Sequence, residues 1–243
     1  MWTWFHRLAS PPSFYRFADL CAPWFLVVSL ALIVVGVYGG LVLAPPDYQQ
    51  GDAFRIIYIH VPAAWMSLFV YTFMAVASVI ALVWRIKLAE VAVAAAAPVG
   101  ASFTALALLT GMLWGKPMWG AYWVWDARLT SELVLLFLYL GVVALNSAIT
   151  DPRAAARAAA LLALVGAVNV PIVHYSVVWW NSLHQGSLFK GGGSTITWSM
   201  LWPLLITALG FTLLFGYTQL MRMRNELLLR ERGSRWVKEL LST

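Results

Sequence analysis

The sequence contains few charged residues, and this shortage decides the broad class of protein. Only 11% of the 243 residues are Asp, Glu, Lys or Arg, whereas 62% are hydrophobic. In soluble domains about a quarter of the residues are charged, so the composition excludes an ordinary soluble domain. It predicts instead a protein embedded in a lipid bilayer.

Cysteine is almost absent as well, and so are several motifs that carry chemistry. Cys21 is the single cysteine, which excludes an intramolecular disulfide and the C-x-x-C-H pattern of c-type cytochromes. No G-x-x-x-x-G-K-[ST] segment is present, so any ATP hydrolysis is expected to belong to another subunit. An intramembrane hydrolase is disfavoured because neither G-x-S-x-G nor H-E-x-x-H occurs.

Long apolar runs are what the sequence has in abundance. A helix needs roughly 20 apolar residues to cross a hydrocarbon core of about 30 Å. We therefore expect an all-α polytopic membrane protein, with one domain of six transmembrane helices in residues 1–220 and an amphipathic basic tail in residues 221–243. The predicted spans are Leu20–Leu43, Ile59–Trp84, Ala92–Leu113, Leu129–Ile149, Ala156–Val177 and Ile196–Leu220.

The distribution of basic residues predicts the orientation of these spans. The side that holds both termini and the second and fourth loops carries twelve Lys and Arg residues. The other side carries four, Arg55, Lys116, Arg128 and Lys190. Because loops rich in Lys and Arg stay in the cytoplasm, we expect cytoplasmic termini in a bacterial inner membrane, with the other loops facing the periplasm. The basic tail is expected to rest on anionic lipid, with a protein partner as the alternative.

A tryptophan-rich segment joins the third and fourth spans on the predicted periplasmic side. Residues 114–126 include five large aromatic side chains, with two Gly and one Pro expected to break a long helix. An aromatic belt at the membrane surface explains one or two tryptophans. Trp119, Trp123 and Trp125 together would form an exposed apolar patch that attracts a partner or ligand. We therefore expect the loop over residues 114–128 to bind a flat, apolar ligand.

Two histidines share the side of the membrane on which this loop lies. His60 begins the second span, and His184 lies in the fifth loop. A single interfacial histidine is usually structural, but two that flank an aromatic loop make metal binding an equal alternative to a structural role. Two neutral imidazoles suit the axial positions of a heme iron, with tryptophans packed against the porphyrin. Candidate partners for the heme propionates, or else ordinary loop charges, are Arg55, Lys116 and Arg128.

Several other polar residues have structural interpretations. Asp126 is placed to cap the fourth span. Glu132, four residues after Arg128, is expected to pair with it, although an acid inside a membrane is also a functional candidate. His174 is expected to bond a backbone carbonyl freed by Pro171. His6, in the cytoplasmic N-terminal segment, is expected to be solvated.

Four stretches of the chain resemble one known family of heme-handling proteins. The tryptophan-rich segment resembles the WWD motif of that superfamily, in Trp114-Gly115-Lys116-Pro117-Met118-Trp119-Gly120 and Trp123-Val124-Trp125-Asp126-Ala127-Arg128-Leu129-Thr130-Ser131-Glu132. The segments that hold the histidines, Ile59-His60-Val61-Pro62 and Ser182-Leu183-His184-Gln185-Gly186-Ser187, resemble its flanking-histidine segments. The resemblance is to the heme exporter protein C (CcmC) family of system I cytochrome c maturation and covers essentially the whole chain. Tyr122 is a small departure, since a tryptophan would also fit there.

The resemblance implies a site and a function. His60 and His184 would be the axial ligands of a non-covalent b-type heme. The expected heme-binding residues are His60, His184, Trp114, Trp119, Trp123, Trp125, Asp126, Arg128 and Arg55.

In that family the protein is not an enzyme but presents heme to the membrane-anchored periplasmic chaperone CcmE. Its other partners are the small membrane protein CcmD, the ATP-binding subunit CcmA and the permease CcmB, in an ABC-type export complex. Two competing hypotheses are a small-molecule permease, for which the chain lacks the usual internal symmetry, and a membrane hydrolase.

Overall fold

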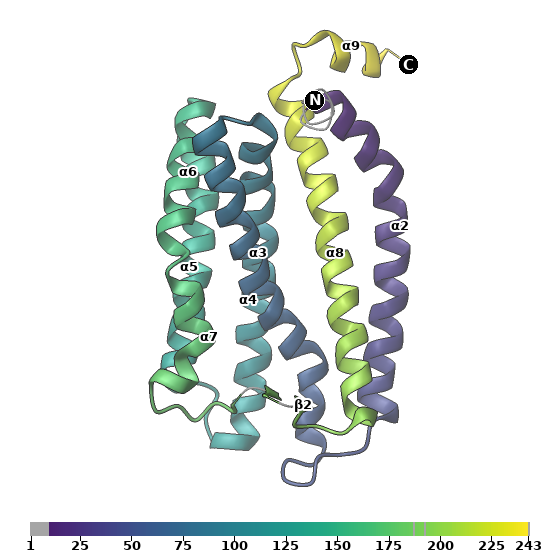
Figure 1. Ribbon diagram of the computed structural model, residues 1–243, viewed down its shortest axis with the longest axis vertical. Helices are drawn as coiled ribbons and strands as arrows, with labels where there is room; N and C mark the ends of the chain where they lie inside the picture. The colour runs from purple at the N-terminus through teal and green to yellow at the C-terminus, as the bar shows by residue number, and fades with distance from the viewer. Residues whose placement is uncertain (1–9, 187, 192, 243) are drawn as a thin grey trace.

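Six helical segments of the computed structural model, which describes residues 10–186, 188–191 and 193–242, are long and apolar enough to cross a membrane. Each coincides with a predicted span, so the all-α, six-span prediction is confirmed (Figure 1). The segments are Pro11–Leu43, Asp52–Trp84, Lys87–Trp119, Ala127–Ala148, Pro152–Trp179 and Trp198–Arg230.

Several of these spans are built from more than one element. The first is α2 (Pro11–Tyr38), which ends in the π-helical turn η1 (Gly39–Leu43), and the second begins with the 3-10 turn η2 (Asp52–Ile56). The fifth is divided into two helices, and a two-stranded antiparallel hairpin precedes the sixth. The remaining elements are α3 (Ile57–Trp84), α4 (Lys87–Trp119), α5 (Ala127–Ala148), α6 (Pro152–Gly166), α7 (Asn169–Trp179), β1 (Phe189–Lys190), β2 (Gly193–Ser194), α8 (Trp198–Arg230) and α9 (Arg235–Leu241).

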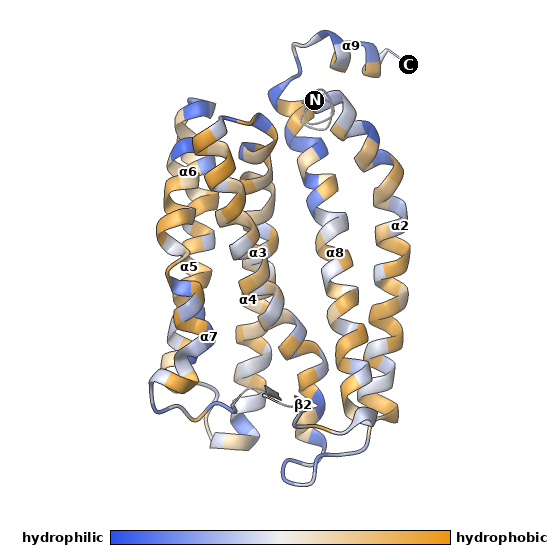
Figure 2. Ribbon diagram, viewed as in Figure 1, coloured by the Kyte–Doolittle hydropathy of each residue, from blue (hydrophilic) through white to orange (hydrophobic). Residues whose placement is uncertain are grey.

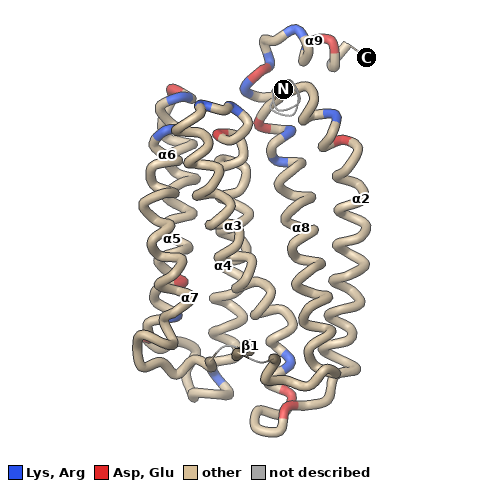
Figure 3. The backbone as a smooth tube through the Cα atoms, viewed as in Figure 1, with Lys and Arg blue, Asp and Glu red and all other residues tan. Residues whose placement is uncertain are grey.

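The helices form an elongated bundle with two distinct ends. In Figure 1, α2 and α8 pack side by side, and α3 and α4 separate this pair from α5, α6 and α7. At one end, the terminal end, α2 begins and α8 finishes; the hairpin lies at the opposite, loop end. Basic residues gather at the terminal end (Figure 3). The structure thus confirms that the start of α2, the end of α8 and the second and fourth loops lie at one end of the bundle. The charge comparison depends on this grouping.

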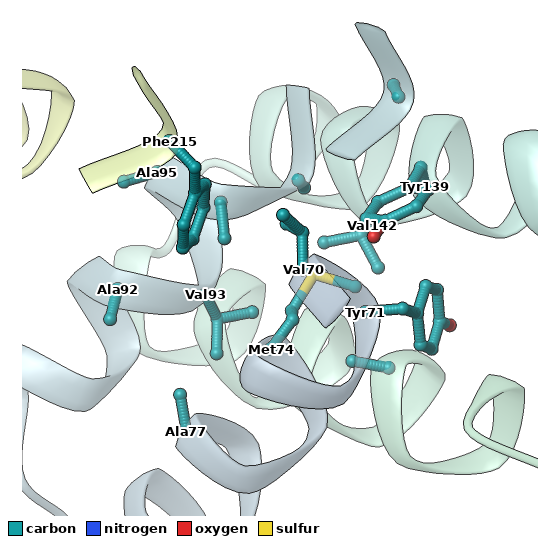
Figure 4. Close-up of a cluster of buried hydrophobic side chains, with 14 of the residues drawn as sticks. Val70, Tyr71, Met74, Ala77, Ala92, Val93, Ala95, Tyr139, Val142 and Phe215 are labelled. Atoms are coloured by element: carbon teal, nitrogen blue, oxygen red, sulfur yellow. The ribbon is translucent and has the colours of Figure 1, made fainter. Parts of the chain in front are cut away.

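Small side chains allow the central helices to approach one another closely. Between α3, α4 and α5 the core contains many alanines together with Val70, Met74 and Val142, and Figure 4 shows Tyr71 and Tyr139 beside them. Lipid chains are as apolar as the core, so close van der Waals packing and hydrogen bonds hold such helices together. The Tyr139 hydroxyl donates to the Ser67 carbonyl at 2.7 Å. Hydrophobic residues dominate the helix shafts in Figure 2, as this environment requires.

Gly100 of α4 lies against the ring of Tyr139, and replacing it with alanine is expected to destabilise the bundle. The added Cβ would lie 2.1 Å from Cε1 of Tyr139, so the ring, whose hydroxyl is bonded to the Ser67 carbonyl, must shift. Overpacking of this kind costs about 1 to 3 kcal/mol, and each kcal/mol lowers the unfolding midpoint by about 2 to 4 °C in a chain of this size. Thermal unfolding in detergent measures the effect. Gly233→Ala, which has nothing within 4 Å of its Cβ, is the control, and equal midpoints would contradict the packing.

Two helix boundaries differ from the sequence predictions for local reasons. Helix α4 continues past Leu113 to Trp119 and ends at Gly120, whose φ of 76° glycine adopts without steric cost. The helix therefore breaks at Gly120 rather than at the glycine or proline before it. The fifth span bends between Gly166 and Asn169 because Pro171 cannot donate to the carbonyl four residues earlier and its ring crowds that carbonyl.

Candidate functional site

His60 lies in the first turn of α3 at the loop end and is held by α4. Its Nδ1 is 3.0 Å from the Ala107 carbonyl oxygen and 3.0 Å from Oγ1 of Thr110. A carbonyl only accepts, so Nδ1 carries the proton and donates. The lone pair of the neutral ring is then on Nε2, which is the nitrogen available to a metal.

Packing fixes the His60 ring in addition to these hydrogen bonds. His60 is 8% exposed, and Trp114 meets its ring edge-on with ring centroids 5.5 Å apart. The Trp114 indole nitrogen donates to Oε1 of Gln50 at 2.9 Å, and Phe54 packs against the indole. At Gly111 a Cβ would lie 3.2 Å from the His60 ring, so this glycine leaves room for the imidazole.

His184 lies in the loop between α7 and β1, and a chain of hydrogen bonds ties it to the start of α5. Its backbone N–H donates to Oγ of Ser182 at 3.1 Å, and the Ser182 hydroxyl donates to Oδ2 of Asp126. The other oxygen of Asp126 accepts from the Leu129 N–H at 2.8 Å, which confirms the predicted helix cap. Asp126 therefore caps α5 and positions the His184 loop.

The protonation of His184 also suits metal binding. Its Nδ1 is 3.0 Å from the Gln185 carbonyl oxygen, to which it donates, so the lone pair is again on Nε2. Burial, and secondarily the positive charge of Arg128, lower the pKa of His184 below its ordinary value. The imidazole is therefore neutral at pH 7 and able to bind a metal ion.

The two imidazole rings are separated by a distance that fits one shared metal. Their ring centroids are 6.2 Å apart, with planes inclined by 34°. A metal–imidazole bond is about 2.0 Å long and the ring centre lies about 1 Å behind the nitrogen, so rings on opposite sides of one metal have centroids about 6 Å apart. No cluster of three His, Cys, Asp or Glu side chains that could hold a metal occurs in the described chain. The pair therefore suits a metal that brings its own equatorial ligands, as heme iron does.

The tryptophans divide into two groups around this pair. Trp114 packs on His60, and Trp119 lies 6.5 Å from the His184 ring, centroid to centroid. Trp123 and Trp125 instead contact each other, with ring centroids 5.4 Å apart. Trp125 is 78% exposed. The Trp123 indole nitrogen is buried without a hydrogen-bond partner. A buried donor without a partner is costly, which makes it a candidate contact for a bound ligand.

The predicted cations are engaged in other contacts within the loop end. Arg128 donates from Nε to Oγ of Ser176 at 3.2 Å and from Nη2 to the His174 carbonyl at 3.0 Å. Arg55 pairs with Asp52 at 2.8 Å and donates to the Gly40 carbonyl at 3.0 Å. Lys116, also at this end, donates to the Gly120 carbonyl at 3.1 Å. These bonds tie α5 to α7 and η2 to η1.

Two structural predictions about neighbouring residues are wrong. Among the described residues Arg128 and Glu132 form no ion pair within 4.0 Å, because the guanidinium bonds to α7; the two charges attract each other only over a longer distance. The His174 ring makes no hydrogen bond to the carbonyl freed by Pro171 in this part of the chain, since Ala167 accepts from the Val170 N–H instead. The His174 ring contacts Tyr175 edge-on. His6 lies outside the described residues.

The spacing of residues in the sequence could have indicated which face of α4 contacts His60. Ala107, Thr110, Gly111 and Trp114 are spaced by three or four residues and so share one face of α4. That face makes every α4 contact to the His60 ring described above.

The chain is similar to known proteins over nearly its whole length. A family model described as heme exporter protein C matches residues 4–238. The protein named heme exporter protein C from Escherichia coli (strain K12) is 54% identical over 241 residues, which cover 99% of this chain and 98% of the relative. The protein of that name from Haemophilus influenzae is 50% identical over 244 residues, covering 100% and 99%. A third, from Bradyrhizobium diazoefficiens, is 54% identical over 224 residues, covering 92% and 85%.

Proposed function

The chain belongs to the heme exporter protein C family, and from this premise we propose that it holds heme between His60 and His184 and hands it to a periplasmic chaperone. Membership of this family supports a role in heme export for cytochrome c biogenesis, as a transport component rather than a catalytic enzyme. In this proposal the heme is a b-type cargo bound without a covalent bond. The loop end faces the periplasm of the inner membrane, in agreement with the positive-inside rule.

The observation that carries this proposal is the 6.2 Å spacing of the two imidazole rings. Each ring presents Nε2, because Nδ1 donates to a backbone carbonyl. Bound heme would supply an iron with two open axial positions and two propionate groups. His60 and His184 bind the iron, Trp114 and Trp119 support the two rings, and Arg55 and Arg128 are candidates for the propionates.

The two proposed ligands differ in how firmly they are held, and this difference favours transfer of the cargo. His60 is buried on a helix and bonded to α4. His184 is on a loop, held mainly through Ser182 and Asp126. We propose that His184 releases the iron first, when the chaperone approaches the exposed Trp125. The proposed chaperone is CcmE, which takes heme covalently through its own histidine, with CcmD, CcmA and CcmB as the other partners.

Transfer between purified proteins tests this function. The heme-loaded protein is mixed with the heme-free chaperone, and covalent heme on the chaperone is measured after denaturing electrophoresis. We expect heme to appear on the chaperone only when the donor retains both His60 and His184. Equal transfer from a donor with both histidines replaced by alanine would contradict the proposal.

Thr110→Val is expected to weaken heme binding about three- to tenfold. Groups that orient a metal-binding histidine typically contribute 10- to 100-fold to metal affinity, but the Ala107 carbonyl still accepts from Nδ1 in this variant. Heme titration of the purified heme-free protein measures the change. Thr72→Val removes a hydroxyl that donates to a carbonyl on α3 far from His60 and is the control. The expectation fails if both variants bind heme as the unmodified protein does.

A further inference from the structure

A large basic pocket lies at the terminal end, opposite the histidines. It has a volume of about 990 Å³ and is formed where α3, α4, α6 and α8 meet. This volume is at the upper end of the range for small-molecule sites, roughly 300 to 1,000 Å³. An adjoining hollow of about 350 Å³ shares three lining residues with the pocket, Asp151, Arg153 and Arg157. The charged residues that line the pocket are Arg85, Lys87, Glu90, Asp151, Arg153, Arg157 and Arg230.

Within the part of the chain that the structure describes, three of the five cations in this pocket form no ion pair with a carboxylate. Lys87 pairs with Glu231 at 2.6 Å. Arg230 pairs with Glu226 at 2.6 Å and approaches Glu90 at 3.8 Å. The carboxylate of Asp151 accepts the Ala154 N–H and so caps α6. This leaves a surplus of positive charge on the three remaining cations, which form no ion pair within the described residues: Arg85, Arg153 and Arg157.

The rest of the pocket lining is apolar, and the adjoining hollow reaches an exposed side chain of α6. Ala81, Leu82, Ala156 and Ala160 line the pocket. Leu161 lines the adjoining hollow and is 51% exposed, one turn below Arg157 on α6. Cations beside apolar side chains at a helix end match the boundary between lipid headgroups and acyl chains.

We propose that this pocket binds the phosphate headgroup of an anionic phospholipid. Guanidinium groups bind phosphate oxygens in pairs of parallel hydrogen bonds, and basic pockets between transmembrane helices on the cytoplasmic side take anionic headgroups. The first-turn N–H groups of α6 add a positive dipole to the same region. The headgroup bridges Arg85, in the α3–α4 connection, to Arg153 and Arg157 on α6, and the acyl chains follow Leu161 into the bilayer.

Native mass spectrometry of the full chain in detergent tests this site. The delipidated protein is titrated with dioctanoyl phosphatidylglycerol or with dioctanoyl phosphatidylcholine, which has no net charge. We expect the anionic lipid to bind at least about tenfold more tightly. The double variant Arg153→Gln/Arg157→Gln is expected to lose on the order of tenfold to thirtyfold in affinity for it, as expected for two cations near the surface. The matched control Arg16→Gln/Arg232→Gln removes two cations of the terminal end outside the pocket and is expected to leave the affinity unchanged.

The alternative source of phosphate is tested in the same experiment. Inorganic phosphate in millimolar excess is expected to leave the anionic lipid bound. If phosphate displaces the lipid, or if the glutamine double variant binds the lipid like the unmodified protein, the proposal is overturned. Unfolding midpoints in lipid-free detergent establish that the variants are folded. If the double variant does not fold, Arg85→Gln, in a connecting segment, is measured instead, with a loss of about fivefold expected and no loss overturning the proposal.

Discussion

Replacing His60 or His184 with alanine is expected to abolish the bis-histidine absorption spectrum of bound heme, and replacing both is expected to remove almost all heme from the purified protein. Each imidazole has its free lone pair on Nε2, and the ring centroids are 6.2 Å apart. Loss of one ring leaves the iron with one protein ligand. Loss of both leaves only packing and charge to hold the heme. Removing a group that merely orients a metal ligand already lowers the affinity 10- to 100-fold. We therefore expect removal of a ligand itself to lower the heme affinity at least about a hundredfold.

Absorption spectra and heme content of the purified variants measure this effect. His174→Ala is a matched control, because it removes an imidazole at the loop end that contacts Tyr175 and takes no part in the proposed site. The control is expected to retain heme and an unchanged Soret band. Unchanged heme content and coordination in His60→Ala and His184→Ala would remove the assignment of these residues as ligands.

Asp126→Ala is expected to weaken heme binding by about tenfold or more, the second largest effect. The variant loses the Leu129 cap and also the acceptor for Ser182, through which the backbone of His184 is held. A ligand on a free loop must be ordered at the moment of binding, which costs conformational entropy. Heme titration measures the affinity, and thermal unfolding measures the contribution of the cap, about 1 kcal/mol.

Asp151→Ala separates the two roles of Asp126. Asp151 caps α6 through the Ala154 N–H at 2.9 Å, but it is at the terminal end and has no connection to His184. Both alanine variants are expected to lower the unfolding midpoint, and only Asp126→Ala is expected to weaken heme binding. Ser182→Ala breaks the connection to His184 while leaving the α5 cap in place, so it is expected to weaken heme binding without the same loss of stability. Equal heme affinity in the Asp126 and Asp151 variants would argue against the connection.

The transmembrane spans could be predicted from sequence because the length of an apolar run is set by the thickness of the bilayer. The ends of the helices were less predictable. Lys116, Pro117 and Met118 continue α4 beyond its apolar run, and only the left-handed conformation of Gly120 ends it. The bend at Gly166 depends on Pro171, which the length of the apolar run does not reveal.

The candidate site could be predicted in part for a similar reason. Counting spans places His60 and His184 at the same end, and the structure brings their rings together. Their hydrogen-bond partners were not predicted, because Ala107 and Ser182 are brought near the histidines only by the packing of α3 on α4 and by the fold of the fifth loop. The short-range pairing expected for Arg128 failed because α7, distant in sequence, offers acceptors that a helix by itself does not reveal.

The most direct test of the proposed heme site is the structure of the heme-loaded protein. It is expected to contain one heme whose iron lies between His60 and His184, bound by Nε2 of both rings, with Trp119 beside the porphyrin and Asp126 still bonded to Ser182. An iron bound by other residues, or a heme packed on Trp123 and Trp125 with both histidines unbound, would contradict the account.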